Sequence, residues 1–183
     1  DNLPIPDEHK NFGRGSESPI KVVQEIFSAG DTKAGVQTIA FNLPNDERVR
    51  EAKGSKKVML KNVIRAKFDK ILKPIAAKVV AQKEFDQVTF DSYFNHILMH
   101  EVSHGLGPGQ ITLEDGTETS VSDELKELYP TVEECKADIL GMYNLLYLMD
   151  KGVFEKDVFS AYATYLGGMF RSIRFGIGEA HGG

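Results

Sequence analysis

The chain has 183 residues, a formal net charge of -5 and 41% hydrophobic residues, which is enough apolar material to bury a core. Its lysines and arginines form no basic stripe that could neutralise phosphates, so a nucleic-acid partner is not expected. Charged residues interrupt its apolar stretches well before the roughly 20 residues needed to span a bilayer, and no signal peptide opens the chain. We therefore expect a soluble protein with no membrane partner.

Cys135 is the only cysteine in the sequence, so an internal disulfide or a zinc site made of cysteines cannot form. Any metal ion must be held by histidine and carboxylate groups. A role for Cys135 as a nucleophile is disfavoured, because acidic neighbours raise the pKa of a thiol. The scarcity of cysteine and the missing signal peptide favour the cytoplasm as the compartment.

The first half of the chain is expected to hold an arm, two helices and a strand. Residues 1–16 are polar and rich in Pro and Gly, as is typical of an N-terminal arm, and 17–183 are predicted to form one zinc-binding catalytic domain. Helical spacing of apolar residues predicts a short helix over 18–29 and a long one over 57–84, bent at Pro74. The β-branched residues 36–41 predict a strand that ends in a turn at Asn42-Leu43-Pro44-Asn45.

The second half is expected to be mainly helical. Apolar periodicity predicts helices over 90–106, 132–151 and 158–175, and the glycines of 105–109 are read as a helix stop rather than a phosphate loop. Short strands at 111–113 and 117–119 flank Asp115-Gly116, which favours a tight turn. The predicted fold class is mainly α with minor β: a helical zinc-binding domain with a short strand segment and a small hairpin.

The segment His100-Glu101-Val102-Ser103-His104 carries the clearest chemistry in the sequence. Two histidines one helical turn apart can both reach one Zn²⁺ at about 2.0–2.1 Å. Zinc bound in this way lowers the pKa of water, and the intervening Glu101 can accept its proton. The motif predicts a hydrolytic zinc site with Glu101 as the general base.

A catalytic zinc site needs a third protein ligand, and the next predicted helix offers Glu133, Glu134 and Asp138. If Glu134 binds zinc, Asp138 lies one turn further on the same face, where it can hydrogen-bond a ligand histidine. The competing interpretation is a capping box that starts at Thr131 and ends at Glu134, and spacing alone does not separate the two. His96, one turn before His100, is a weaker alternative ligand because Ile97 follows it in place of a glutamate.

Three segments, HEVSHGLGPG, EECKADILG and FRSIRFGIGEAHGG, occur in this order and together resemble the dipeptidyl peptidase III family of zinc exopeptidases. The resemblance runs from about Val36 to the C-terminus. Better-known members have one more residue between the two histidines, whereas this chain has the five-residue form of a subgroup found in bacteria and in plant proteins fused to a Nudix domain. The resemblance implies that His100, His104 and Glu134 are the zinc ligands. Glu133, like Asp138, is expected to lie beside these ligands.

The resemblance also implies roles for residues that the bare sequence leaves without chemistry. His181, in the Ala180-His181 step, is expected to stabilise the tetrahedral intermediate. Asn42, Asn45 and Arg50 resemble a substrate-binding segment in which a strand pairs with the peptide backbone. Family members are considerably longer and form two lobes, so the chain is expected to be the metal-bearing part of a larger two-lobed enzyme, with the remainder of that chain as a partner.

The predicted function is zinc-dependent peptide hydrolysis that releases N-terminal dipeptides. Two alternatives stay open from the sequence. The same chemistry could serve a non-peptidase zinc hydrolase, or the chain could be a zinc-stabilised interaction module without turnover.

Overall fold

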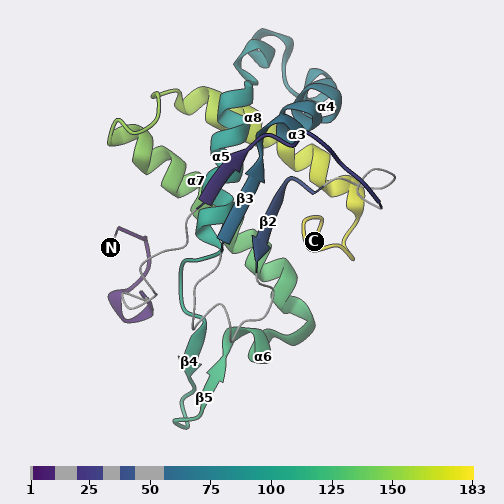
Figure 1. Cartoon of the computed structure of the whole chain (residues 1–183). Coiled ribbons are helices and arrows are strands. Elements are labelled where there is room, and N and C mark those ends of the chain that lie inside the picture. Colours follow the sequence, from purple (N-terminus) through teal and green to yellow (C-terminus); the bar gives the residue numbers. More distant parts are fainter. Residues whose placement is uncertain (1, 11–19, 31–37, 44–55) are drawn as a thin grey trace.

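The computed structural model describes residues 2–10, 20–30, 38–43 and 56–183. Within these ranges the fold is mainly α with minor β, as predicted. Three long helices dominate it: α5 (Phe90–Ser103), α7 (Tyr129–Asp150) and α8 (Val158–Ser172). Helix α5 packs between the other two, and a small sheet lies in front of it in Figure 1.

The small sheet has the strand order β1-β3-β2, with β1 (Ile20–Val23) parallel and β2 (Ala40–Leu43) antiparallel to the central β3 (Lys56–Leu60). The prediction of a helix over 18–29 is wrong for its described part, because β1 is a strand and no helix follows it. Ile26 and Phe27, two residues of the expected apolar face, are 97% and 80% exposed. Pairing with a strand distant in sequence overrides the local helical spacing.

The predicted strand at 36–41 is shifted toward the C-terminus in its described part. Strand β2 runs through Asn42 and Leu43, where the sequence predicted a turn. Residues 36 and 37 lie outside the described residues. Strand β2 is an edge strand among the described strands, since its only pairing there is with β3.

The helix predicted over 57–84 begins later and changes its winding. Its first residues form the central strand β3, and the helical part divides into α3 (Lys61–Lys67), a π-helical segment η2 (Phe68–Leu72) and α4 (Lys73–Val79). A 3₁₀ turn, η3 (Gln82–Gln87), completes the region. Pro74 has no N–H to donate to the preceding turn, and the wider π-helical turn before it accommodates this loss. The predicted bend is therefore a local change of helix type.

Both α5 and α8 begin at side-chain caps that also join the two helices. Thr89 caps α5 by accepting from the Ser92 N–H, and Asp157 caps α8 by accepting from the Ser160 N–H. The hydroxyl of Ser160 lies 2.8 Å from that of Thr89 and 2.7 Å from that of Ser92. The two helices are thereby aligned at their N-termini.

Most of the core lies beside the first half of α5. Its apolar cluster joins α5 to η2, α4 and the sheet, with buried members Met59, Ile64, Phe68, Leu72, Ala76, Val80, Val88, Phe90, Tyr93, Phe94, Ile97 and Ala163. A smaller cluster joins the second half of α5 to α7 and α8. No described helix is long and apolar enough to cross a membrane.

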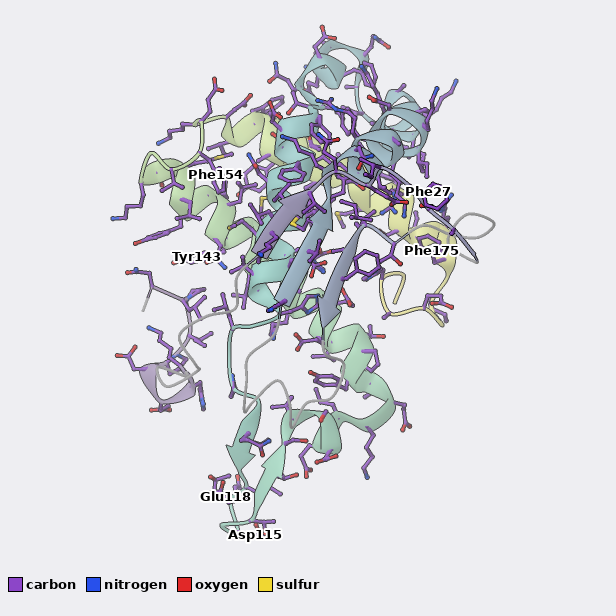
Figure 2. The ribbon with its side chains drawn as sticks, viewed as in Figure 1. Phe27, Asp115, Glu118, Tyr143, Phe154 and Phe175 are labelled. Carbon is purple, nitrogen blue, oxygen red and sulfur yellow. The ribbon has the colours of Figure 1, made fainter. Side chains whose placement is uncertain are left out.

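The predicted hairpin is present as β4 (Gln110–Thr112) and β5 (Glu118–Ser120). Asp115 and Glu118 lie at its far end, away from the long helices (Figure 2). Gly116 has a φ of +86°, which a glycine adopts without strain, and the Asp115 carboxylate accepts from the Thr117 N–H. A short helix, α6 (Val121–Leu125), and a 3₁₀ turn, η4 (Lys126–Leu128), lead from the hairpin into α7.

The two ends of the chain carry little regular structure. A 3₁₀ turn, η1 (Asp7–His9), is the regular element of residues 2–10, and the Tyr143 hydroxyl on α7 donates to the Asn2 carbonyl. The predicted boundary between an arm and a domain at residue 16 lies outside the described residues. After α8, a 3₁₀ turn, η5 (Ile173–Phe175), leads into the C-terminal segment.

Candidate metal centre

The end of α5 and the first turns of α7 bring the predicted ligands together. His100 lies in the last helical turn of α5, and His104 is the residue that follows the helix as its C-cap. Helix α7 begins at Tyr129, two residues before Thr131, and Thr131 does not cap it. The capping-box interpretation is therefore wrong, because Glu134 lies in the second turn of α7 rather than at its start.

His100, His104 and Glu134 form the group of three metal-ligating side chains that the described residues bring within reach of one ion, their ligand atoms lying within 4.8 Å of one another. His100 Nε2 lies 3.0 Å from His104 Nε2 and 3.1 Å from Glu134 Oε2, and the third distance, His104 Nε2 to Glu134 Oε2, is 3.7 Å. Ligands about 2.0–2.1 Å from a tetrahedral zinc lie about 3.3–3.4 Å apart. The three distances bracket that value, so the group fits a single zinc ion.

Each ligand histidine has a carboxylate on its other ring nitrogen. His100 Nδ1 lies 2.7 Å from Asp138 Oδ1, and His104 Nδ1 lies 3.0 Å from Glu133 Oε1. An ionised carboxylate only accepts, so both contacts favour a proton on Nδ1. The Nε2 lone pairs of both rings then face each other and Glu134, which is an arrangement that a cation stabilises.

The pKa values of His100 and Glu134 also favour a positive charge between these side chains. Burial opposes the charged form of His100, but the carboxylates of Asp138 and Glu134 outweigh it and raise the pKa of His100 to about 9. Burial would raise the pKa of Glu134, yet the imidazoles of His100 and His181 hold it well below its usual range. Glu134 Oε2 is buried and has no partner in hydrogen-bond geometry. A proton on His100 thus occupies the position suited to a metal cation.

His181, from the C-terminal segment, lies beside this group. Its Nδ1 is 3.0 Å from Glu134 Oε2, and its ring centroid is 6.2 Å from that of His100. Contact with Glu134 raises the pKa of His181, and burial opposes the rise only in part. Its side chain is 57% exposed, so it can also face a molecule in the adjoining cleft.

A cleft of about 780 Å³ adjoins the metal group, and its lining includes the three ligands, Glu101 and His181. Its lining also includes Thr38, Ile39 and Ala40, at the start of the edge strand β2. Glu101, the predicted base, therefore borders the same space as the ligands. The cleft has room for a short peptide and extends from β2 to the metal group.

Of the remaining predicted site residues, two lie within the described residues and two lie outside them. His96 is not part of the ligand group: its Nε2 lies 3.5 Å from the Asp138 carbonyl, and its ring packs 4.8 Å from that of Tyr165. Asn42 contributes its backbone to β2, where it is paired with Lys57. Asn45 and Arg50 lie outside the described residues.

Three residues near the site were not found from the sequence. Tyr165 lines the cleft, and burial raises the pKa of its hydroxyl. Lys57 is 4% exposed and donates to the backbone carbonyl of Glu101. Lys136 contacts Glu133. Only Lys136 had a usable signal, the three-residue spacing from Glu133 on one helix; Lys57 and Tyr165 reach the site through tertiary packing.

The chain is similar to proteins of one peptidase family. The sequence profile of peptidase family M49 matches residues 26–124. The structure of dipeptidyl peptidase III from Caldithrix abyssi is similar with a TM-score of 0.92 and 68% identity, over 99% of this chain and 34% of that chain. The enzyme from Corallococcus sp. strain EGB gives a TM-score of 0.89 and 49% identity over the same shares.

A plant relative is similar over the whole length of this chain. Nudix hydrolase 3 of Arabidopsis thaliana is 48% identical over 183 residues, which are 23% of that protein. The chain thus spans about a quarter of this relative and about a third of the two solved enzymes. The name of the plant protein describes a molecule much longer than the segment that matches.

A His-Glu-x-x-His helix that meets a glutamate of a neighbouring helix is a site of the metallopeptidase class. The chain belongs to peptidase family M49. The resemblance seen in its sequence motifs is thereby confirmed.

Proposed function

We propose that this chain provides the catalytic metal site of a zinc-dependent peptidase that releases dipeptides from the N-terminus of peptides. The observation that carries the proposal is the convergence of His100, His104 and Glu134 in a cleft whose lining also includes the start of an edge strand. Membership of peptidase family M49 supports the peptide substrate. The metal-ligand spacing supports zinc.

Zinc held by these three residues supplies Lewis-acid polarisation and acidifies water. The side chains of the chain itself perform the proton transfers. Glu101 takes a proton from the attacking water and delivers it to the leaving amine. His181, held by Glu134, donates to the oxyanion that forms at the scissile carbonyl.

Strand β2 has an unpaired edge among the described strands and is therefore suited to bind the substrate backbone. A peptide that adds to this edge gains main-chain hydrogen bonds independent of its sequence. Asn42, Asn45 and Arg50 belong to the segment that would hold the N-terminal end of such a peptide. Because the chain spans about a third of the solved relatives, the complete cleft would include residues of a longer protein.

Two variants separate the proposed roles in the intact protein. Glu101→Gln should keep one zinc per chain, while hydrolysis of a dipeptidyl-naphthylamide falls by about 10²–10⁴-fold, the usual contribution of a general base. Glu134→Ala should lose zinc together with activity. Glu155→Gln, at an exposed position distant in sequence, serves as the charge-matched control.

The same measurements separate the alternatives. A wild-type protein that binds zinc but hydrolyses no dipeptidyl substrate would leave a non-peptidase hydrolase or an interaction module. Undiminished hydrolysis by Glu101→Gln would remove Glu101 from the role of base.

A further inference from the structure

Lys136 makes two contacts that join α7 to the end of α5. Its Nζ lies 2.8 Å from Glu133 Oε1, the same oxygen that faces His104 Nδ1 at 3.0 Å. It also donates to the Leu106 carbonyl at 2.9 Å. Leu106 lies two residues beyond His104. One cation therefore contacts both the carboxylate that orients His104 and the backbone just after it.

The two ligand histidines differ in how firmly their helix holds them. His100 lies inside the last turn of α5, and its partner Asp138 contacts it directly at 2.7 Å. His104 is the C-cap, beyond the last helical residue, where a helix tends to fray. Its position depends on the loop that follows and on the Glu133 carboxylate. Lys136 is the side chain that contacts both.

We propose that Lys136 is a positioning residue for the metal centre, which fixes Glu133 against His104 and holds the end of α5 in the ligand geometry. This inference rests on the proposed zinc site. The side chains of Lys136 and Glu133 are 29% and 19% exposed, so solvent screens their attraction less than that of a surface pair. A positive charge at this end of α5 also interacts favourably with the negative end of the helix dipole.

The chain offers a matched control for this ion pair. Lys156 contacts Asp150 at 2.6 Å, but both side chains are about two-thirds exposed, at 66% and 65%. Lys156→Met thus removes a lysine and a salt bridge of similar length that does not touch a ligand histidine. A pair this exposed contributes little to stability.

The test compares Lys136→Met, Lys136→Gln, Lys136→Arg and Lys156→Met in the intact protein. Zinc affinity is measured by competition with a chelator, and the geometry of the site by the visible absorption of the Co²⁺-substituted protein. Groups that orient a metal ligand typically contribute 10–100-fold to affinity, and a group one step further out should lie at the lower end, about tenfold.

We expect Lys136→Met and Lys136→Gln to weaken zinc binding about tenfold and to change the Co²⁺ spectrum. Lys136→Arg keeps the positive charge and should retain the wild-type zinc affinity and Co²⁺ spectrum. Lys156→Met should also leave the affinity and the spectrum unchanged. Either neutral variant suffices if the other fails to fold by circular dichroism. Unchanged affinity and spectrum in a folded neutral variant, even with a lower melting temperature, would overturn the proposal. Failure of the wild-type protein to bind zinc or Co²⁺ would instead overturn the proposed function.

Discussion

The two halves of α5 are held in place by different forces. Its first half is anchored by apolar packing: Phe90 and Phe94 have ring centroids 5.8 Å apart, and Phe90 also packs edge-on against Phe68. Its second half rests on a smaller apolar cluster and adds polar contacts, in which His100 and His104 each face a carboxylate of α7. The first half supplies most of the apolar core, and the second half also presents a cluster of titratable groups.

This difference indicates which half of α5 depends on a bound proton or metal ion. Apolar burial stabilises the first half whatever the pH or the metal content. The second half places two imidazoles and three carboxylates close together, an arrangement that depends on a bound proton or cation for compensation. We therefore expect changes in the first half to alter folding, and changes in the second half to alter metal binding.

Phe94→Ala should give the largest effect, a loss of folding stability without a change in metal binding. The side chain is 9% exposed within the apolar cluster, and such truncations cost about 3–5 kcal/mol of unfolding free energy. Urea unfolding of the metal-free protein measures this loss. Zinc affinity of the folded fraction should stay within about twofold of wild type, and a larger fall would mean that the two halves are coupled.

Gly141→Ala should affect both folding and metal binding, since this glycine lies where α7 crosses α5. A Cβ there would meet the backbone N and Cα of His100 at 2.9 and 3.0 Å. The helices would have to separate at the proposed ligand His100, which costs about 1–3 kcal/mol and displaces His100 from Glu134. Chelator competition and urea unfolding measure the two losses.

Gly168→Ala is the control for this substitution. Its Cβ would meet Leu72 Cδ1 at 3.9 Å, an ordinary contact. That variant should be as stable as wild type or up to about 1 kcal/mol more stable, because Ala favours helix. Normal zinc binding by Gly141→Ala would show that the close approach does not set the ligand geometry.

The pH dependence of metal binding should give the smallest effect, about tenfold in affinity for each pH unit. Below a pKa of about 9, His100 holds a proton that zinc must displace, so affinity rises from pH 7 toward 9 and then levels off. Calorimetry in two buffers of different ionisation enthalpy should show about one proton released per zinc near pH 7.5. Binding without proton release would place the compensating charge elsewhere.

The candidate metal ligands on α5 could be predicted from the sequence because the geometry of a helix is local. The four-residue separation of His100 and His104 determines their proximity in any helix. Glu134 could not be separated from a capping role by spacing, because the choice depended on where α7 begins. The family resemblance favoured the ligand role, and the start of α7 at Tyr129 excludes the cap.

The sheet was predicted least well, because its strands are defined by partners distant in sequence. Strand β1 carries an apolar spacing that suits a helix equally well, and only its pairing with β3 distinguishes them. Strand β3 directly precedes α3, so its apolar residues merged with the helical pattern that follows. Neither ambiguity can be resolved within a local window.

Lys57 connects the small sheet to the predicted base Glu101. It stands opposite Asn42 in the pairing of β3 with β2, and its amine reaches the carbonyl of Glu101. One strand pair and one side chain therefore separate the edge of the sheet from the predicted base. A peptide paired with that edge would therefore have a defined position relative to Glu101. A shift of the pairing by one residue would turn the side chains of the peptide to the opposite faces of the sheet.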